Sequence, residues 1–139
     1  MSRTNVGFLL AKASQRFNER LMARFADRGF PEIRASYGSV LVPLFEAGPL
    51  RPGAIAARAR LSKQSMTGLV KQCEAAGLVV RVRDPADGRA YQVSLTPRGH
   101  ELQAVAEDVL AELDRELVAI LGPRRRDALV EALKGVMEL

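Results

Sequence analysis

Residues 61–71 read LSKQSMTGLVK, and this segment has the pattern of a helix with one buried and one exposed face. Ser62 is a good helix N-cap, and an apolar stripe follows at the spacing i, i+3, i+4, i+7: Met66, Leu69, Val70 and Cys73. Residues placed at about 100° intervals put small, polar and basic side chains on the other face. These are Gln64, Thr67, Gly68, Lys71 and Ala75, with Lys63 and Ser65 beside them near the N-terminal end.

This outward face has the chemistry that a DNA major groove requires. Amides and hydroxyls can pair with base edges, a glycine permits close approach, and cations meet phosphates. An ordinary solvated helix more often carries pairs of Glu and Lys, but acids are missing from this face. Residues Ser62 to Ala76 are therefore predicted to form a helix that reads DNA. The alternative is a solvent-facing helix that is short of acids.

Two β-rich runs follow, Leu78–Arg83 and Ala90–Leu95, with six residues between them, Asp84–Arg89. The connection contains Pro85 and Asp87-Gly88, which are turn signals, so the runs are predicted to form a hairpin. In the second run, apolar residues at every second position predict one buried face and one wet face; they are Tyr91, Val93 and Leu95.

The hairpin is also basic. Arg81, Arg83 and Arg89 are predicted to project outward or to lie at its tip. A basic hairpin beside a DNA-reading helix can place an arginine in the neighbouring minor groove, where the negative potential is strongest over narrow A-tracts.

This succession resembles the winged helix-turn-helix of the MarR family of bacterial transcriptional regulators. The resemblance covers roughly residues 36–100 and is most specific in the wing, where Asp84 precedes Asp87-Gly88-Arg89 and Leu95-Thr96-Pro97-Arg98-Gly99 opens a long helix. By resemblance, Arg89 is the wing arginine, and Asp84, together with Asp87, braces the loop. The alternative for Arg89 is an ion pair with one of these two acids inside the turn.

The composition suits one compact domain. The chain has 139 residues, of which 47% are hydrophobic and 27% charged, and its net charge is +5. Residues 51–99 hold 9 basic and 3 acidic groups, whereas residues 100–139 hold 5 basic and 9 acidic ones. The positive charge is thus concentrated on the proposed DNA-reading lobe, as an electrostatic footprint for phosphates requires.

The expected fold is mainly α with a small β-hairpin wing. A first helix is predicted from about Asn5 to Arg28, a second from a Ser36 cap, and a third from Pro52. Pro43 lies inside the second, so this helix is expected to be kinked or to start later. The winged helix-turn-helix lobe is expected to span residues 36–95, and a helical dimerisation region residues 5–29 and 96–139.

The long helix after the wing points to a second subunit. Thr96 and Pro97 begin it, and an apolar stripe continues to Leu121 before Gly122-Pro123 breaks it. A helix of about 25 residues is roughly 37 Å long, longer than the core of this domain can cover. The first helix and the last two, the final one from about Pro123 to Leu139, are therefore predicted to build a two-fold homodimer.

The sequence contains no pattern of residues that is typical of an enzyme active site. His100 is the single histidine and Cys73 the single cysteine; no metal-ligand spacing or phosphate-binding glycine loop is present, so neither a cofactor nor a metal is expected. Cys73 lies on the inward stripe, where a cysteine behaves as a small hydrophobe rather than as a redox sensor.

The remaining class of inducer is a small aromatic or phenolic molecule, as is common in the family. Aromatic rings and two arginines could form its site between the lobe and the dimer helices; the residues named for it are Arg16, Phe17, Arg20, Tyr37 and Phe45. The alternative is that each is an ordinary core or surface residue.

The resulting prediction is a sequence-specific, ligand-responsive transcriptional regulator that binds a pseudo-palindromic operator in double-stranded DNA as a homodimer. Repression is the favoured mode of action, and activation is the alternative. No signal peptide or membrane span is visible in the sequence, so the expected location is the cytoplasm. The residues predicted to contact DNA are Ser62, Lys63, Gln64, Ser65, Thr67, Gly68, Lys71, Arg81, Arg83 and Arg89. The rival interpretations are a winged-helix protein-interaction module and a DNA-binding protein without sequence preference.

Overall fold

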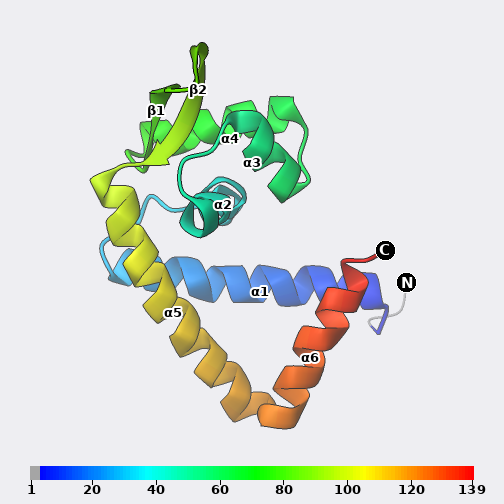
Figure 1. Cartoon of the computed structure of the whole chain (residues 1–139). Helices are drawn as coiled ribbons and strands as arrows, with labels where there is room; N and C mark the ends of the chain where they lie inside the picture. Colours follow the sequence, from blue (N-terminus) through cyan, green and yellow to red (C-terminus); the bar gives the residue numbers. More distant parts are fainter. Residues whose placement is uncertain (1–3) are drawn as a thin grey trace.

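A computed structural model describes residues 4–139. The chain forms six α-helices, one 3-10 turn and one hairpin within this range: α1 (Val6–Asp27), η1 (Ala35–Tyr37), α2 (Gly38–Ala47), α3 (Pro52–Ala59), α4 (Lys63–Ala75), β1 (Val79–Asp84), β2 (Asp87–Leu95), α5 (Pro97–Leu121) and α6 (Pro123–Val136). Figure 1 shows α2, α3, α4 and the hairpin gathered in one lobe, while α1, α5 and α6 form a three-sided frame beside it. The predicted fold, mainly α with a hairpin wing, is confirmed.

The long helices begin and end where the local signals predict. The Asn5 side chain caps α1 by accepting a hydrogen bond from the backbone N–H of Phe8 at 3.2 Å. Thr96 caps α5 in the same way through the N–H of Gly99, and Pro97 takes the first helical position. The helix α5 has 25 residues, the length that the apolar stripe predicts.

The second helix starts later than the Ser36 cap predicts. Ser36 lies inside the 3-10 turn η1 and caps nothing, and α2 begins at Gly38. Pro43 is buried inside α2, where its missing N–H removes one intrahelical bond. Of the two outcomes expected for this segment, the later start is the one observed.

The wing has a shorter connection than the predicted six residues. The strands extend to Asp84 and from Asp87, so that only Pro85 and Ala86 lie between them. Arg83 pairs with Tyr91 whereas Asp84 pairs with Asp87, so a bulge in β2 takes up the extra residues. The predicted alternation is also weaker than expected: Val93 is fully buried, while Tyr91 and Leu95 are half-buried against the core.

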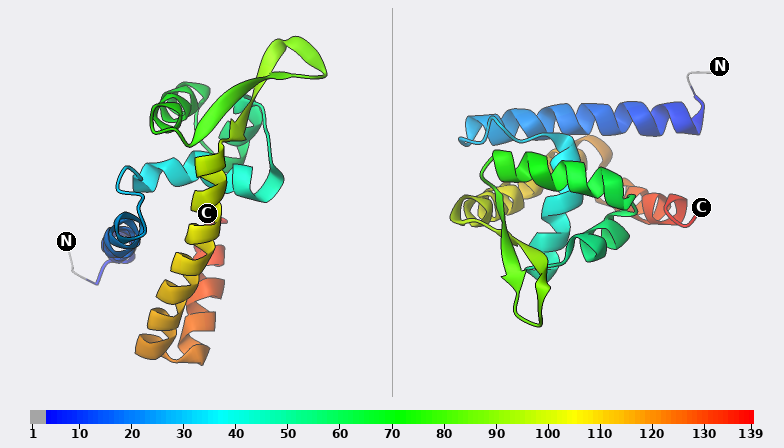
Figure 2. Two further views of the ribbon diagram at one scale, coloured as in Figure 1. Left: turned by 90° about the vertical axis from the view of Figure 1, so that its left-hand side faces the viewer. Right: turned by 90° about the horizontal axis from the view of Figure 1, so that it is seen from above.

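The core lies inside the lobe and against the first half of α5. Its largest fully buried side chains come from α2, α3, α4, the hairpin and α5: Leu44, Ile55, Met66, Leu78, Leu102, Val40, Val70, Val93, Val109 and Cys73. The helix α6 contributes no buried residue within the single described chain. Figure 2 shows the hairpin projecting from the lobe, and Figure 1 shows α6 turning back from the C-terminal end of α5. Within residues 4–139, no helix is both long and apolar enough to cross a membrane.

The junction between the lobe and α5 is tightly packed. The N–H of Thr96 donates to the carbonyl oxygen of Leu78 at 3.0 Å, and the Thr96 hydroxyl donates to that of Gly77 at 2.6 Å. Gly99 lies so close that a Cβ atom on it would stand 2.3 Å from the same Leu78 oxygen. The first turn of α5 is therefore fixed against the residues that precede β1.

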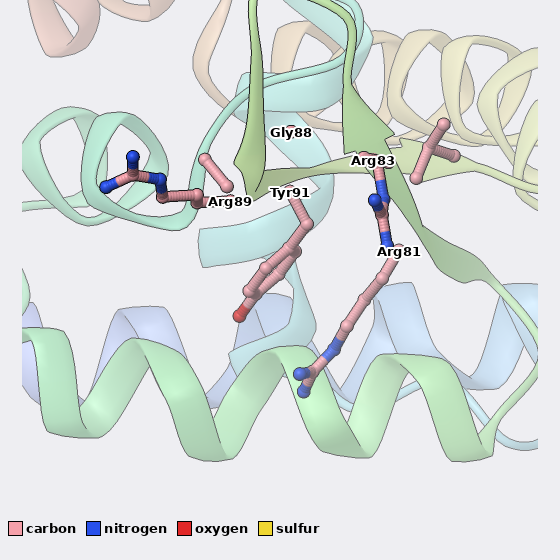
Figure 3. Close-up of a pocket in the computed structure, with 7 residues that line it drawn as sticks. Arg81, Arg83, Gly88, Arg89 and Tyr91 are labelled. Carbon is pink, nitrogen blue, oxygen red and sulfur yellow. The ribbon is translucent and has the colours of Figure 1, made fainter.

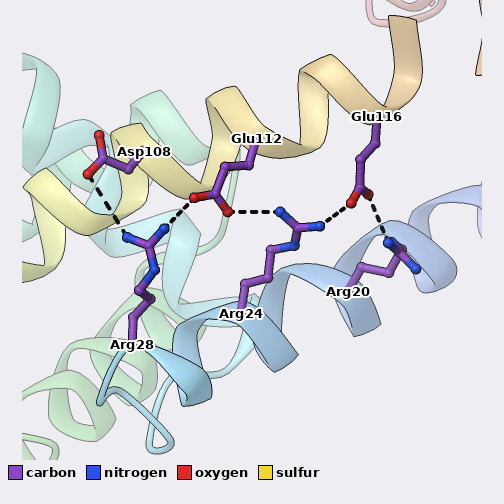
Figure 4. A network of polar contacts seen from close by, with 6 residues as sticks. All are labelled: Arg20, Arg24, Arg28, Asp108, Glu112 and Glu116. Carbon is purple, nitrogen blue, oxygen red and sulfur yellow. Dashed lines mark hydrogen bonds and ion pairs between the residues drawn. The ribbon is translucent and has the colours of Figure 1, made fainter. Parts of the chain in front are cut away.

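An ion-pair ladder joins α1 to α5. Three arginines at four-residue spacing on α1 face three acids at the same spacing on α5 (Figure 4); the residues are Arg20, Arg24, Arg28, Asp108, Glu112 and Glu116. Arg20 binds Glu116 at 2.9 Å, and Arg24 binds Glu112 at 2.8 Å. The hydrogen bond from Arg20, with the charges of Arg20 and Arg24, lowers the pKa of the Glu116 carboxyl despite partial burial.

Acid is expected to weaken the contact between α1 and α5. Because the folded-state pKa of Glu116 lies below the ordinary glutamate value, its stabilisation is complete above about pH 4.5 and is lost as pH falls through the folded-state pKa. The difference in unfolding free energy between wild type and Glu116→Gln should be largest at neutral pH and disappear in strong acid. Urea unfolding at a series of pH values measures it. Glu107→Gln on the same helix is the control, and a pH-independent difference for Glu116→Gln would contradict the role of its carboxylate.

Candidate DNA-binding interface

The exposed face of α4 carries the polar and basic residues that the sequence predicts there. Ser62 caps the helix by accepting a hydrogen bond from the N–H of Ser65 at 3.1 Å, and the two hydroxyls lie 3.0 Å apart. The inward stripe of Met66, Val70 and Cys73 is buried, with Leu69 half-buried. The predicted outward residues are all exposed: Lys63, Gln64, Ser65, Thr67, Gly68, Lys71 and Ala75.

Two features of this face bear on how it could meet DNA. The Thr67 hydroxyl donates its hydrogen to the carbonyl oxygen of Lys63 at 2.8 Å, so its oxygen remains free to accept a hydrogen bond. Gly68 faces open space, because a Cβ atom on it would meet nothing within 4 Å. The centre of the exposed face is therefore unobstructed.

The acid at the start of the wing turn is buried and bound from both sides. Asp84 accepts hydrogen bonds from Nε of Arg51 at 2.6 Å and from the N–H of Ala86 at 2.8 Å. The bond from Ala86, followed by that from Arg51, lowers the pKa of the Asp84 carboxyl against the opposing effect of burial. Asp84 in turn raises the pKa of the Arg51 guanidinium. The turn is thus tied to the N-terminus of α3, because Arg51 is the residue immediately before that helix.

Arg89 is held by its backbone, not by its side chain. Its N–H donates to Oδ1 of Asp87 at 3.0 Å, and its guanidinium makes no ion pair in the described part of the chain. The ion pair with Asp84 or Asp87 that was the alternative for Arg89 is therefore not present. The side chain is exposed and extends to one side of the hairpin, not toward α4 (Figure 3).

Cross-strand pairing decides which face of the wing carries the other two arginines. Arg81 pairs with Val93 and Arg83 with Tyr91, and directly paired residues share one face of a sheet. Both arginines are exposed, as predicted, but they lie on the face of the buried Val93 and not on the far face. Side chains two residues apart on a strand point to the same face. Arg81 and Arg83 therefore share the face of Val79, which is buried at the start of β1.

Two shallow hollows lie on this lobe, one lined by three arginines and the other by a single lysine. One, of about 280 Å³, is formed by the wing and includes Arg81, Arg83, Arg89 and Tyr91 (Figure 3). The other, of about 220 Å³, joins the first turns of α3 and α4 and is lined by Pro52, Gly53, Lys63 and Thr67. No acidic side chain lines either hollow.

The five residues named for a small ligand are not gathered in either hollow. Arg20 is bound to Glu116, and Arg16 pairs with Glu19 at 3.4 Å on its own helix. Tyr37 is buried, whereas Phe17 and Phe45 are half-buried and pack against the core. These contacts account for each side chain without a ligand. Within residues 4–139, no group of three or more metal-ligating side chains is assembled.

Cys73 is fully buried, and burial raises the pKa of its thiol to about 12. We expect the native protein to react with iodoacetamide at pH 7.5 at least about a hundredfold more slowly than the urea-unfolded chain, because only the thiolate is nucleophilic. Mass spectrometry of timed samples measures this. If the wild type responded to peroxide and a Cys73→Ser variant bound DNA normally but lost this response, Cys73 would be a redox sensor and not an unreactive core residue.

Sequence reasoning identified the exposed α4 face but missed two residues that hold the wing. Arg51 binds Asp84 from 33 residues away, and Glu74 binds Arg81 across the turn between α4 and β1. No local pattern marks Arg51 as the partner of Asp84. The spacing of Glu74 and Arg81, seven residues around a turn, could have suggested their pairing.

Comparison with known proteins gives the same result as the geometry. Residues 43–90 match the model of the MarR family. The chain is 34% identical over 130 residues to the HTH-type transcriptional regulator MT0903.1 of Mycobacterium tuberculosis, covering 94% of this chain and 89% of that protein.

Solved structures agree over nearly the whole chain. A probable transcriptional regulator from Pseudomonas aeruginosa is 28% identical, with a TM-score of 0.77 over 96% of this chain and 97% of that one. The transcriptional repressor CouR, solved bound to a 23-mer DNA duplex, is 25% identical, with a TM-score of 0.81 over 99% of this chain and 98% of that one. The chain belongs to the MarR family of helix-turn-helix transcriptional regulators, which bind DNA and are not enzymes.

Proposed function

We propose that this regulator is a repressor that binds a pseudo-palindromic operator as a homodimer. The observation that carries the proposal is the exposed face of α4, which is polar, basic and free of acids, beside a wing that bears exposed arginines. Each subunit would place α4 in a major groove and its wing in the flanking minor groove, on half-sites about one helical turn apart. Such a protein acts on the chromosome, so its proposed location is the cytoplasm. The similarity to CouR, a repressor bound to DNA, supports this function.

The proposed DNA contacts follow from exposure and from the chemistry of each side chain. Gln64, Ser65 and Thr67 would meet base edges, and Ser62 would place the first turn of α4 against the backbone. Lys63, Lys71, Arg83 and Arg89 would meet phosphates or the minor groove, since none of them has an acidic partner among the described residues. Arg81 differs, because its guanidinium is bound to Glu74.

The proposed dimer rests on apolar side chains that the single chain leaves exposed on the long helices. Val6 and Ile120 are 65% and 75% exposed, and α6 buries none of its residues. Exposed apolar surface of this extent on three neighbouring helices supports an interface with a second copy of the chain. Sedimentation at micromolar concentration tests the dimer, and a stable monomer would contradict it.

We further propose that a small aromatic or phenolic molecule releases the protein from DNA. Phe17 lies on α1 together with Arg16 and Arg20, whereas Tyr37 belongs to η1 and Phe45 to α2. A bound carboxylate would have to compete with Glu116 for Arg20. Screening aromatic acids for loss of DNA binding tests this part of the proposal.

The deciding experiment is fluorescence anisotropy on DNA from upstream of the gene for this protein, against scrambled DNA, at two salt concentrations. A preference of about a thousandfold or more for the upstream DNA would establish a specific regulator. Equal, salt-sensitive binding to both would favour a DNA-binding protein without sequence preference. No binding at low salt would favour a protein-interaction module.

Gly68→Ala is expected to separate folding from DNA binding. A methyl group there meets nothing within 4 Å in the free protein, and alanine favours a helix interior over glycine by about 1 kcal/mol. The variant should therefore unfold at higher urea concentration and yet bind the operator more weakly, because the methyl group would stand between α4 and the bases. Urea unfolding and anisotropy measure the two effects. Unchanged affinity would mean that this part of α4 stands away from DNA.

A further inference from the structure

Arg81 joins the last turn of α4 to both strands of the wing. Its Nε donates a hydrogen bond to Oε1 of Glu74 at 2.8 Å, and its Cζ lies 4.8 Å from the centroid of the Tyr91 ring. Glu74 belongs to α4, Arg81 to β1 and Tyr91 to β2. Figure 3 shows the side chains of Arg81 and Tyr91 reaching toward α4, whereas that of Arg89 extends to one side of the hairpin. We call the three side chains of Glu74, Arg81 and Tyr91 the Arg81 clamp.

The outer part of the wing needs such support because Tyr91 is the one apolar side chain there that packs against the core among the described residues, and it is only half-buried. A two-stranded hairpin is marginally stable on its own. Val79 is buried, but Val80 and Val82, on the face of β1 opposite Val79 and Arg81, are 44% and 48% exposed. Burial of apolar side chains therefore fixes the base of the wing but not the angle of its outer half.

Polar contacts tie the wing to both helices of the helix-turn-helix. At the base, Leu50 and Val93 exchange backbone hydrogen bonds of 3.2 and 2.8 Å. Near the tip, Arg51 at the N-terminus of α3 holds Asp84 at 2.6 Å. The Arg81 clamp supplies the corresponding tie to α4.

The charge of Arg81 is already neutralised in the free protein. A cation that is paired with a carboxylate at 2.8 Å releases few counterions from DNA, and the carboxylate itself repels phosphates. The guanidinium carbon also lies over the Tyr91 ring, a cation–π contact made while Nε binds Glu74, and lysine lacks the several donors of arginine that permit both contacts. These contacts distinguish Arg81 from Arg83, which is two residues away on the same face and has no acidic partner in the described chain.

We propose that Arg81 is a positioning residue and not a DNA contact. Together with Glu74 and Tyr91 it fixes the angle between α4 and the wing, and thus the distance between the side chains in the major groove and Arg89 in the minor groove. The inference rests on the proposed function, since it concerns the same DNA-binding surface. If this is so, removing the charge of either Arg81 or Glu74 weakens operator binding, although the first change removes a positive charge and the second a negative one.

The test compares Arg81→Gln and Glu74→Gln, with Arg83→Gln as the matched control. Anisotropy on upstream and scrambled DNA over a range of salt concentrations gives the affinity and the slope of log K against log[salt]. We expect both clamp variants to lose about tenfold in preference for the upstream DNA, with little change in slope. Arg83→Gln should instead flatten the slope by about 0.9 per bound subunit on either duplex.

The sign of the Glu74→Gln effect separates the two roles. If Arg81 contacted phosphate, removing the neighbouring carboxylate would tighten binding to both duplexes, and Arg81→Gln would flatten the slope as much as Arg83→Gln does. That pair of results would overturn the proposal. The double variant provides a further check, because members of one clamp should give a combined loss no larger than that of either single change.

Hydrogen exchange of the free protein tests the clamp without DNA. Amide exchange in β1 and β2 should be several-fold faster in Arg81→Gln and Glu74→Gln than in the wild type, and unchanged in Arg83→Gln. Unchanged exchange in all three variants would overturn the positioning role. Equal binding of the wild type to upstream and scrambled DNA would count against the proposed function alone, so the two failures are distinguishable.

Discussion

Gly99→Ala is expected to lower the free energy of unfolding by about 2 to 3 kcal/mol, the range for forcing extra volume into a packed site. The added methyl group would stand 2.3 Å from the carbonyl oxygen of Leu78, which is backbone and cannot rotate away. That oxygen also accepts the hydrogen bond from the Thr96 N–H, so moving it disturbs the cap of α5. The loss should appear as a lower midpoint in urea with an unchanged slope.

A matched control is available at Gly53, in the first turn of α3. A Cβ atom there meets nothing within 4 Å, so Gly53→Ala should be neutral or stabilise the protein by up to about 1 kcal/mol. The two variants make the same chemical change in the first turn of a helix. If Gly99→Ala were as stable as Gly53→Ala, the close approach of α5 to the wing would be wrong.

The helices could be predicted because their signals are local. The Ser62 cap, the Thr96-Pro97 start of α5 and the apolar periods each depend on residues within one or two turns. The outward face of α4 followed from the same period, and each residue predicted to lie there is exposed. The start of α2 was misplaced because a 3-10 turn precedes the helix, and Ser36 fits a cap and a turn equally well.

The wing shows where local reasoning ends. Pro85 and Asp87-Gly88 predict a turn, but the bulge that shortens it depends on pairing between the strands. The face that carries Arg81 and Arg83 depends on the strand register, which the burial of Val79 decides. Contacts between distant parts of the chain, such as that between Arg51 and Asp84, follow only from the folded arrangement.

Replacing both Lys71 and Arg89 with alanine is expected to have the largest effect on DNA binding. Each exposed cation that meets DNA contributes about 0.9 to the slope of log K against log[salt], so the double variant should flatten the slope by about 1.8 for one bound subunit. At 0.15 M salt this corresponds to roughly a 30-fold weaker association constant. Salt titrations of the anisotropy signal on scrambled and upstream DNA measure the slope directly.

The size of this change also tests the number of subunits on the DNA. Two bound subunits would each lose two contacts, so the slope should flatten by about 3.6 and not by 1.8. Arg124→Ala with Arg125→Ala is the control: it removes the same charge from the exposed first turn of α6, at the opposite end of the molecule from the wing (Figure 1). That control should leave the slope nearly unchanged, because its charges lie beyond the roughly 8 Å screening length at physiological salt. Equal slopes for wild type and the Lys71/Arg89 variant would refute the placement of α4 and the wing on DNA.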